Sequence, residues 1–214
     1  MPEDVDSQAV LTTLTTEHFT LQGARSSTVS ESSARSALYL GSLSASLVAL
    51  GFVAQISATG DTFRVFALVV LPTLFVLGLF TFVRLVENSI EDLFYGRAIN
   101  RIRSYYIALA GPEADYFLMS GHDDVVGVLR NMGLSPSRWQ LYFTAASAVA
   151  VVNGVVGGSA VALALWTAFD SDLGVSALVG AAFAVASVAA HLRWERRRLE
   201  AGVAAEVRSP SPSR

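Results

Sequence analysis

The chain has 214 residues, of which 52% are hydrophobic and 15% are charged, and its formal net charge is −3. So apolar a composition lies outside the range of ordinary soluble domains and favours a chain embedded in lipid. The small net charge argues against a general affinity for polyanions, and the absence of cysteine excludes disulfides and thiolate metal sites. We therefore expect a membrane protein whose main partner is the lipid bilayer and which binds no nucleic acid.

Four apolar stretches follow one another along the chain, each free of Asp, Glu, Lys, Arg and His. At a rise of about 1.5 Å per residue, roughly twenty residues of α-helix cross the hydrocarbon core of a bilayer. The connections between the stretches are short, long and short in turn, which predicts two helical hairpins. The predicted spans are residues 37–57, 65–83, 141–169 and 173–190.

The predicted fold class is therefore all-α, a bundle of four transmembrane helices in two hairpins with cytoplasmic helical extensions. The chain divides into an N-terminal helical segment (1–36), a first hairpin (37–83), an amphipathic helical connection (84–140), a second hairpin (141–190) and a basic tail (191–214). The last residues, VRSPSPSR, are typical of a disordered end.

Arginine placement predicts the orientation, because basic residues resist translocation and acidic residues count little. All fifteen basic residues are arginine, and fourteen of them precede the first span, lie in the long connection or belong to the tail. Only Arg64 falls on the other side. We expect both termini and the long connection in the cytoplasm, and the chain in the cell inner (plasma) membrane.

An arginine cluster follows the last span, at Arg193, Arg196, Arg197 and Arg198. Our interpretation is a topological anchor whose guanidinium groups reach toward anionic lipid. A specific lipid or partner site is the alternative. Nucleic-acid binding is not expected, because no aromatic platform or groove-reading module accompanies the cluster.

Apolar residues between Val86 and Leu109 recur at threes and fours, so the second span is expected to continue as an amphipathic stalk to Ala110. Further on, Ser120 and Asp123 form a capping-box pattern, which predicts a short helix that stops at Gly133. The third span is expected to be capped by Ser135, with Pro136 in its first turn.

His122, Asp123 and Asp124 invite a metal interpretation, but adjacent helical residues point in different directions. We instead expect both aspartates to interact with the positive N-terminus of the following helix. His18 is expected to be solvated, and His191 to lie at the membrane interface. No nucleophile–base arrangement, phosphate loop or HExxH pattern is present in the sequence, and we expect no enzyme, cofactor or metal site.

Small residues at helical spacing let membrane helices approach closely. They serve either packing within one bundle or association of several copies, and Asn153 adds a side chain that can cross-link helices by hydrogen bonding. The expected helix-packing residues are Gly41, Ala45, Asn153, Gly154, Gly158 and Gly180.

The stretch SSARSALYLGSLSASLVALG, Ser32 to Gly51, resembles the pore helix of Orai-type calcium channels. Those channels also have four spans, cytoplasmic termini and a helical extension of the last span, here Arg193 to Val207. Ala49 stands where that family has its acidic filter residue, so the resemblance does not extend to calcium selectivity. Over its whole length the chain resembles uncharacterised actinobacterial four-span integral membrane proteins.

Three functions remain open. The spans carry no ionisable side chain, which argues against an ion-coupled carrier. The leading hypothesis is a self-associating protein, a homo-oligomer that forms a channel or pore lined by Ser42, Ser46 and Gln55. The alternatives are a non-conducting scaffold or regulatory subunit whose stalk docks a cytoplasmic protein, and a membrane-disrupting effector.

Overall fold

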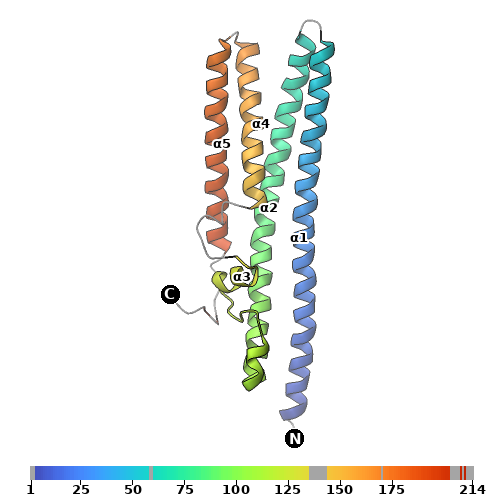
Figure 1. Ribbon diagram of the computed structural model, residues 1–214, viewed down its shortest axis with the longest axis vertical. Helices are drawn as coiled ribbons and strands as arrows, with labels where there is room; N and C mark the ends of the chain where they lie inside the picture. Colours follow the sequence, from blue (N-terminus) through green and yellow to red (C-terminus); the bar gives the residue numbers. More distant parts are fainter. Residues whose placement is uncertain are drawn as a thin grey trace. The chain divides into compact units, whose positions relative to one another are not determined.

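The computed structural model describes residues 3–57, 60–134, 144–169, 171–202, 208 and 210. Every regular element among them is a helix, so the all-α prediction is confirmed. The predicted cap at Ser135 and Pro136 lies outside the described residues. The elements are α1 (Glu3–Ile56), α2 (Asp61–Ala110), the 3-10 helix η1 (Gly111–Tyr116), α3 (Val125–Asn131), α4 (Ala145–Ala168) and α5 (Leu173–Gly202) (Figure 1).

Two compact units share these helices. The membrane unit consists of residues 32–86 and 142–198, and the stalk unit consists of residues 1–31, 87–141 and 199–214. Helices α1, α2 and α5 each contribute to both units, whereas α4 belongs to the membrane unit and α3 to the stalk unit.

Four helices of the described chain, α1, α2, α4 and α5, are long and apolar enough to cross a membrane. Large apolar side chains face outward from the membrane unit, for example Leu178, 72% exposed, and Val185, 71% exposed, while Asn153 is fully buried. Such an arrangement is unfavourable in water and suits a hydrocarbon solvent. The chain is a multi-pass membrane protein, as its composition predicts.

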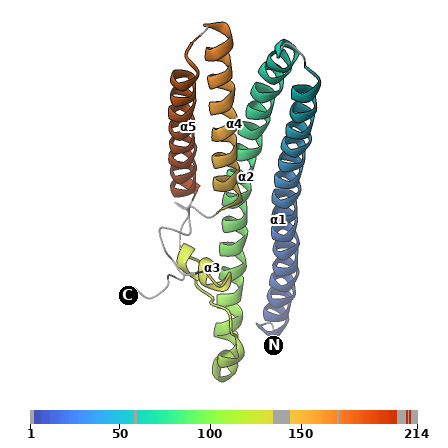
Figure 2. The ribbon, with the colours of Figure 1, turned by 45° about the horizontal axis from the view of Figure 1, so that its top comes forward.

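The membrane unit contains the hairpins α1–α2 and α4–α5 (Figure 2), and α4 contacts each of the other three helices. It contacts α5 where Gly158 meets Gly180, and α2 where Gly157 meets Phe75. Its third neighbour is α1, through a hydrogen bond between Tyr39 and Asn153. Small residues on α4 thus let the other helices come close to its backbone.

Helix α1 runs without interruption through the threonine-rich segment that precedes the first apolar stretch. Threonine is a moderate helix former because its hydroxyl competes for backbone groups. Here the hydroxyls of Thr12, Thr16 and Thr20 donate to the carbonyl four residues earlier, at 2.9, 3.0 and 3.0 Å. The hydroxyl groups are therefore satisfied within the helix itself.

In the stalk unit, α2 ends at Ala110, as predicted, and Gly111 follows with a positive φ of 56°. The predicted cap of α3 is wrong. The helix begins at Val125, and the Asp124 side chain accepts a hydrogen bond from the Gly127 N–H at 2.7 Å. Ser120 lies outside the helix because its carbonyl and those of the residues after it accept hydrogen bonds from side chains of α2 and α3.

Candidate functional site

Close backbone contact between α4 and α5 depends on glycine. A Cβ atom built on Gly158 would lie 2.5 Å from the Gly180 carbonyl oxygen, and a Cβ on Gly180 would lie 2.5 Å from the Gly158 oxygen. One turn away, a Cβ on Gly154 would lie 2.6 Å from a methyl group of Val188. Of the expected packing residues, the structure thus brings Gly154, Gly158 and Gly180 together at one helix–helix contact.

Asn153 lies at the centre of the membrane unit. Its Oδ1 accepts a hydrogen bond of 3.3 Å from the Tyr39 hydroxyl, and both side chains are fully buried. On α2, any side chain at Gly78 would collide with the Asn153 amide. The Asn153 amide nitrogen has no hydrogen-bond partner among the described residues. The sequence signalled Asn153 as a polar residue in an apolar stretch but gave no indication of Tyr39 as its partner.

The small residues of α1 have a different environment. Gly41 and Ala45 are exposed, and a Cβ on Gly41 would meet no atom within 4 Å. Ser42 and Ser46 lie on one face of α1, but at about 3.6 residues per turn Gln55 lies roughly half a turn from Ser46. A single pore-facing stripe on α1 therefore does not include all three residues.

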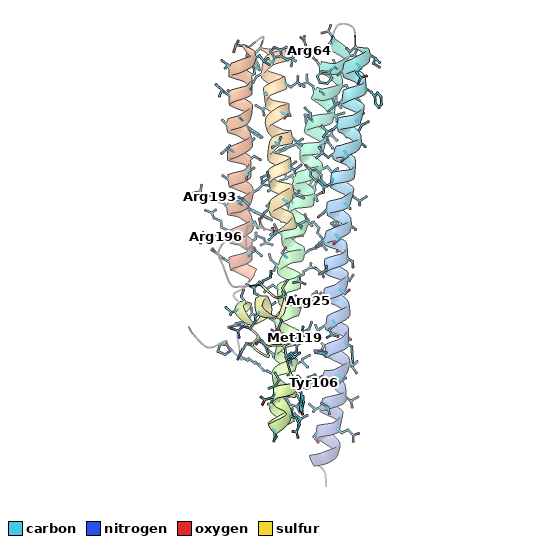
Figure 3. All side chains as sticks on the ribbon, in the orientation of Figure 1. Arg25, Arg64, Tyr106, Met119, Arg193 and Arg196 are labelled. Atoms are coloured by element: carbon cyan, nitrogen blue, oxygen red, sulfur yellow. The ribbon has the colours of Figure 1, made fainter. Side chains whose placement is uncertain are left out.

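The four arginines of the predicted anchor are exposed on α5, and Figure 3 shows Arg193 and Arg196 pointing away from the helix. Arg64 lies at the other end of the membrane unit (Figure 3). Its guanidinium carbon lies 4.6 Å from the centre of the Trp166 ring, and Asp61 lies 3.5 Å away. A cation–π contact and an exposed carboxylate therefore compensate the charge of Arg64.

A buried carboxylate, Glu195, joins the beginning of α4 to α5, and it is not among the residues that the sequence predicted. It is 3% exposed and accepts hydrogen bonds from the hydroxyls of Thr144 at 2.8 Å and Ser147 at 3.1 Å. Glu195 stands among the arginines of the cluster in the sequence. Because those arginines face solvent, the sequence pattern gives no sign that this one charged residue is buried. One turn earlier, His191 is buried and packs against Phe82 with ring centres 4.6 Å apart.

In the stalk unit, α1 and α2 are joined by an ion pair between distant parts of the chain. Arg25 donates to both carboxylate oxygens of Asp92, with Nε–Oδ1 at 2.8 Å and Nη2–Oδ2 at 3.1 Å. This two-point geometry is the strongest form of an arginine–carboxylate contact.

Also in the stalk unit, the ring of His18 meets that of Tyr106 edge-on, with the ring centres 5.8 Å apart. His18 is half-buried: its Nδ1 lacks a hydrogen-bond partner among the described residues, whereas its Nε2 lies 3.0 Å from Gln22 Nε2 at an exposed position.

The stalk unit contains a second polar cluster around Asp123, whose side chain is fully buried. Its Oδ2 accepts from Arg101 Nε at 2.8 Å, and its Oδ1 accepts from the Arg208 N–H at 3.0 Å. Arg97, also buried, donates to the Asp123 carbonyl at 2.8 Å. Asp123 therefore pairs with arginine, and the prediction that it interacts with the helix N-terminus holds only for Asp124.

The described residues contain no group of three or more His, Cys, Asp or Glu that could hold a metal ion. Comparison with known proteins found no matching family model, no matching curated protein and no matching solved structure.

Proposed function

We propose that this chain is a scaffold or regulatory subunit of the inner (plasma) membrane, whose stalk unit docks a soluble protein in the cytoplasm. The observation that carries the proposal is a group of large apolar side chains exposed at the end of the stalk unit. Tyr116 is 85% exposed and Leu118 is 98% exposed, and Leu109 nearby is 61% exposed. Exposed apolar patches of this kind are typical of protein interaction surfaces.

The position of this patch along the chain favours a protein partner over lipid. Helix α2 continues from Val83 to Ala110 without a break, and this distance corresponds to about 40 Å of helix. The patch follows directly in η1 and the segment after it. Earlier along the stalk unit, Phe94 is also exposed, whereas Ile102 is buried and belongs to the core of that unit.

The arginine distribution supports cytoplasmic termini. Four exposed arginines follow the last span, and the polar core of the stalk unit contains several more. Arg64, alone on the other side in this proposal, is compensated by Trp166 and Asp61. Translocating Arg64 alone across the membrane costs far less free energy than translocating the arginine-rich segments.

A photo-crosslinking amino acid at position 118 tests the docking proposal in living cells. We expect a covalent adduct with one soluble protein, and no such adduct when the same amino acid replaces Arg130, which is exposed on α3. Tyr116→Ser in the same chain should abolish the adduct while leaving the protein in the membrane. Labelling of lipid alone, or of a second copy of the chain alone, would contradict the docking proposal.

A second candidate is an oligomeric pore. It is favoured by the exposed small-residue face of α1 at Gly41 and Ala45, which meets no neighbour within one copy. Such a face is suited to close contact with a helix of another copy. The mass of the purified chain in nanodiscs tests this candidate. An oligomer that conducts ions in liposomes would support a pore, whereas a monomer would exclude a pore shared between copies.

A further inference from the structure

The stalk unit contains a cavity of about 470 Å³ that neither the docking surface nor the Asp123 cluster uses. It lies between α1 and α2, and α3 and the segment after η1 also contribute to its lining. Arg25 and Met119 are two of its lining residues, and they come from α1 and from the segment after η1 (Figure 3). Its volume falls within the range of pockets for small organic ligands.

The cavity lining carries one net positive charge. Two arginines, Arg25 and Arg103, and one carboxylate, Asp92, line it. Arg25 and Asp92 neutralise each other through their two-point contact. Arg103 donates to two uncharged oxygens, Asn100 Oδ1 at 2.9 Å and the Ser120 carbonyl at 3.4 Å. In the described part of the chain no carboxylate pairs with Arg103, so no neighbouring negative charge balances its positive charge.

Both contacts of Arg103 use the same nitrogen, Nη1, which leaves its Nε and Nη2 for another acceptor. Burial, and then the nearby charge of Arg25, lower the pKa of Arg103. A guanidinium nevertheless stays charged in proteins, so Arg103 holds a positive charge in a partly desolvated space. An anion beside Arg103 would balance this charge and supply the missing acceptor.

The remaining lining residues favour an organic ligand over a simple inorganic ion. Val29, Ile99 and Met132 give apolar walls, while Gln22 and Ser26 offer uncharged hydrogen-bonding groups. We propose that this cavity binds a small organic oxyanion, a phosphate monoester or a carboxylate on an apolar or aromatic body, with Arg103 as its main anchor. Arginine suits either group because its planar donors match two oxygens at once. The proposal concerns the stalk unit alone and holds whether or not a partner docks on it.

Binding is tested by calorimetry on the full chain in nanodiscs with four probes: inorganic phosphate, adenosine monophosphate, benzoate and uncharged adenosine. We expect saturable binding of adenosine monophosphate or benzoate, weaker binding of inorganic phosphate and none of adenosine. The probe that binds identifies the headgroup as phosphate or carboxylate. Absence of saturable binding by both organic anions, or equal binding of adenosine, would overturn the proposal.

Variants then locate the site. Arg103→Gln should weaken binding by about tenfold or more, since one charge-assisted contact is lost, whereas Arg130→Gln on the exposed face of α3 should leave it unchanged. Met119→Trp keeps both arginines and fills the cavity from its half-exposed rim, so it should also weaken binding while leaving the charges in place. Unchanged affinity in both the Arg103 and the Met119 variants would place the ligand elsewhere and overturn the proposal.

Discussion

Gly158 and Gly41 belong to similar small-residue motifs, yet an added methyl group would meet different surroundings at the two positions. At Gly158 it would press against the Gly180 carbonyl and the Ala184 methyl group, and at Gly41 it would meet no atom of the chain. We therefore expect Gly158→Ala to destabilise the membrane unit by about 1–3 kcal/mol. Gly41→Ala is the matched control and should leave the thermal midpoint of the monomeric chain in nanodiscs unchanged. An equal loss in both variants would contradict the role of the α4–α5 contact.

His18 gives the stalk unit a pH dependence whose sign follows from its surroundings. Burial, and then the charge of Arg103, lower the pKa of His18 below its ordinary 6.5. The folded state thus binds the proton less readily than the unfolded state, so stability is complete above pH 6.5 and falls as the pH drops below it. Thermal unfolding of the stalk unit between pH 7.5 and 5 should show this fall, and His18→Gln should reduce it. A rise in stability toward low pH that depends on His18 would contradict the assignment.

At the scale of elements, the attachment of α3 to α2 depends on a buried carboxylate. Asp123 accepts from Arg101 and from the backbone of residue 208, and Arg97 donates to its carbonyl. Asp123→Ala removes the side-chain acceptor and should cost about 2–3 kcal/mol, because arginine donors are left unsatisfied. Faster hydrogen exchange in α3 and faster tryptic cleavage after Arg130 would show this loss of stability. Asp115→Ala, in the exposed part of η1, should change neither rate.

Helix periods were predictable from the sequence, whereas contacts between distant residues were not. The apolar stretches and the end of α2 at Ala110 follow from local composition and from the Gly111-Pro112 pair. The start of α3 does not follow from local composition, because side chains of α2, distant in sequence, donate hydrogen bonds to the carbonyls before Asp124. Arg25 and Asp92 are 67 positions apart, with more than half of α1 and more than half of α2 between them, and no spacing rule connects them. Tertiary hydrogen bonds thus decide those features that local propensity leaves open.

At the scale of the whole molecule, the absence of cysteine in the sequence makes the orientation directly testable. A single Thr62→Cys places a thiol in the exposed first turn of α2, and Leu118→Cys places one at the end of the stalk unit. In intact spheroplasts we expect a membrane-impermeant maleimide to label position 62 and not position 118, because the arginine-rich segments stay inside. Permeabilised cells, in which both positions should react, provide the control. The opposite pattern in intact cells would reverse the proposed topology.

The brief connection of residues 169–172 also bears on how the protein is made. Because only this short stretch separates α4 from α5, we expect α5 to leave the ribosome soon after α4 has entered the bilayer. In the proposed topology the arginines behind α5 should stay on the cytoplasmic side, so that the two helices insert as a pair. Gly158 and Gly180 could then come into contact during synthesis. The second hairpin would form as a unit before it packs against the first hairpin.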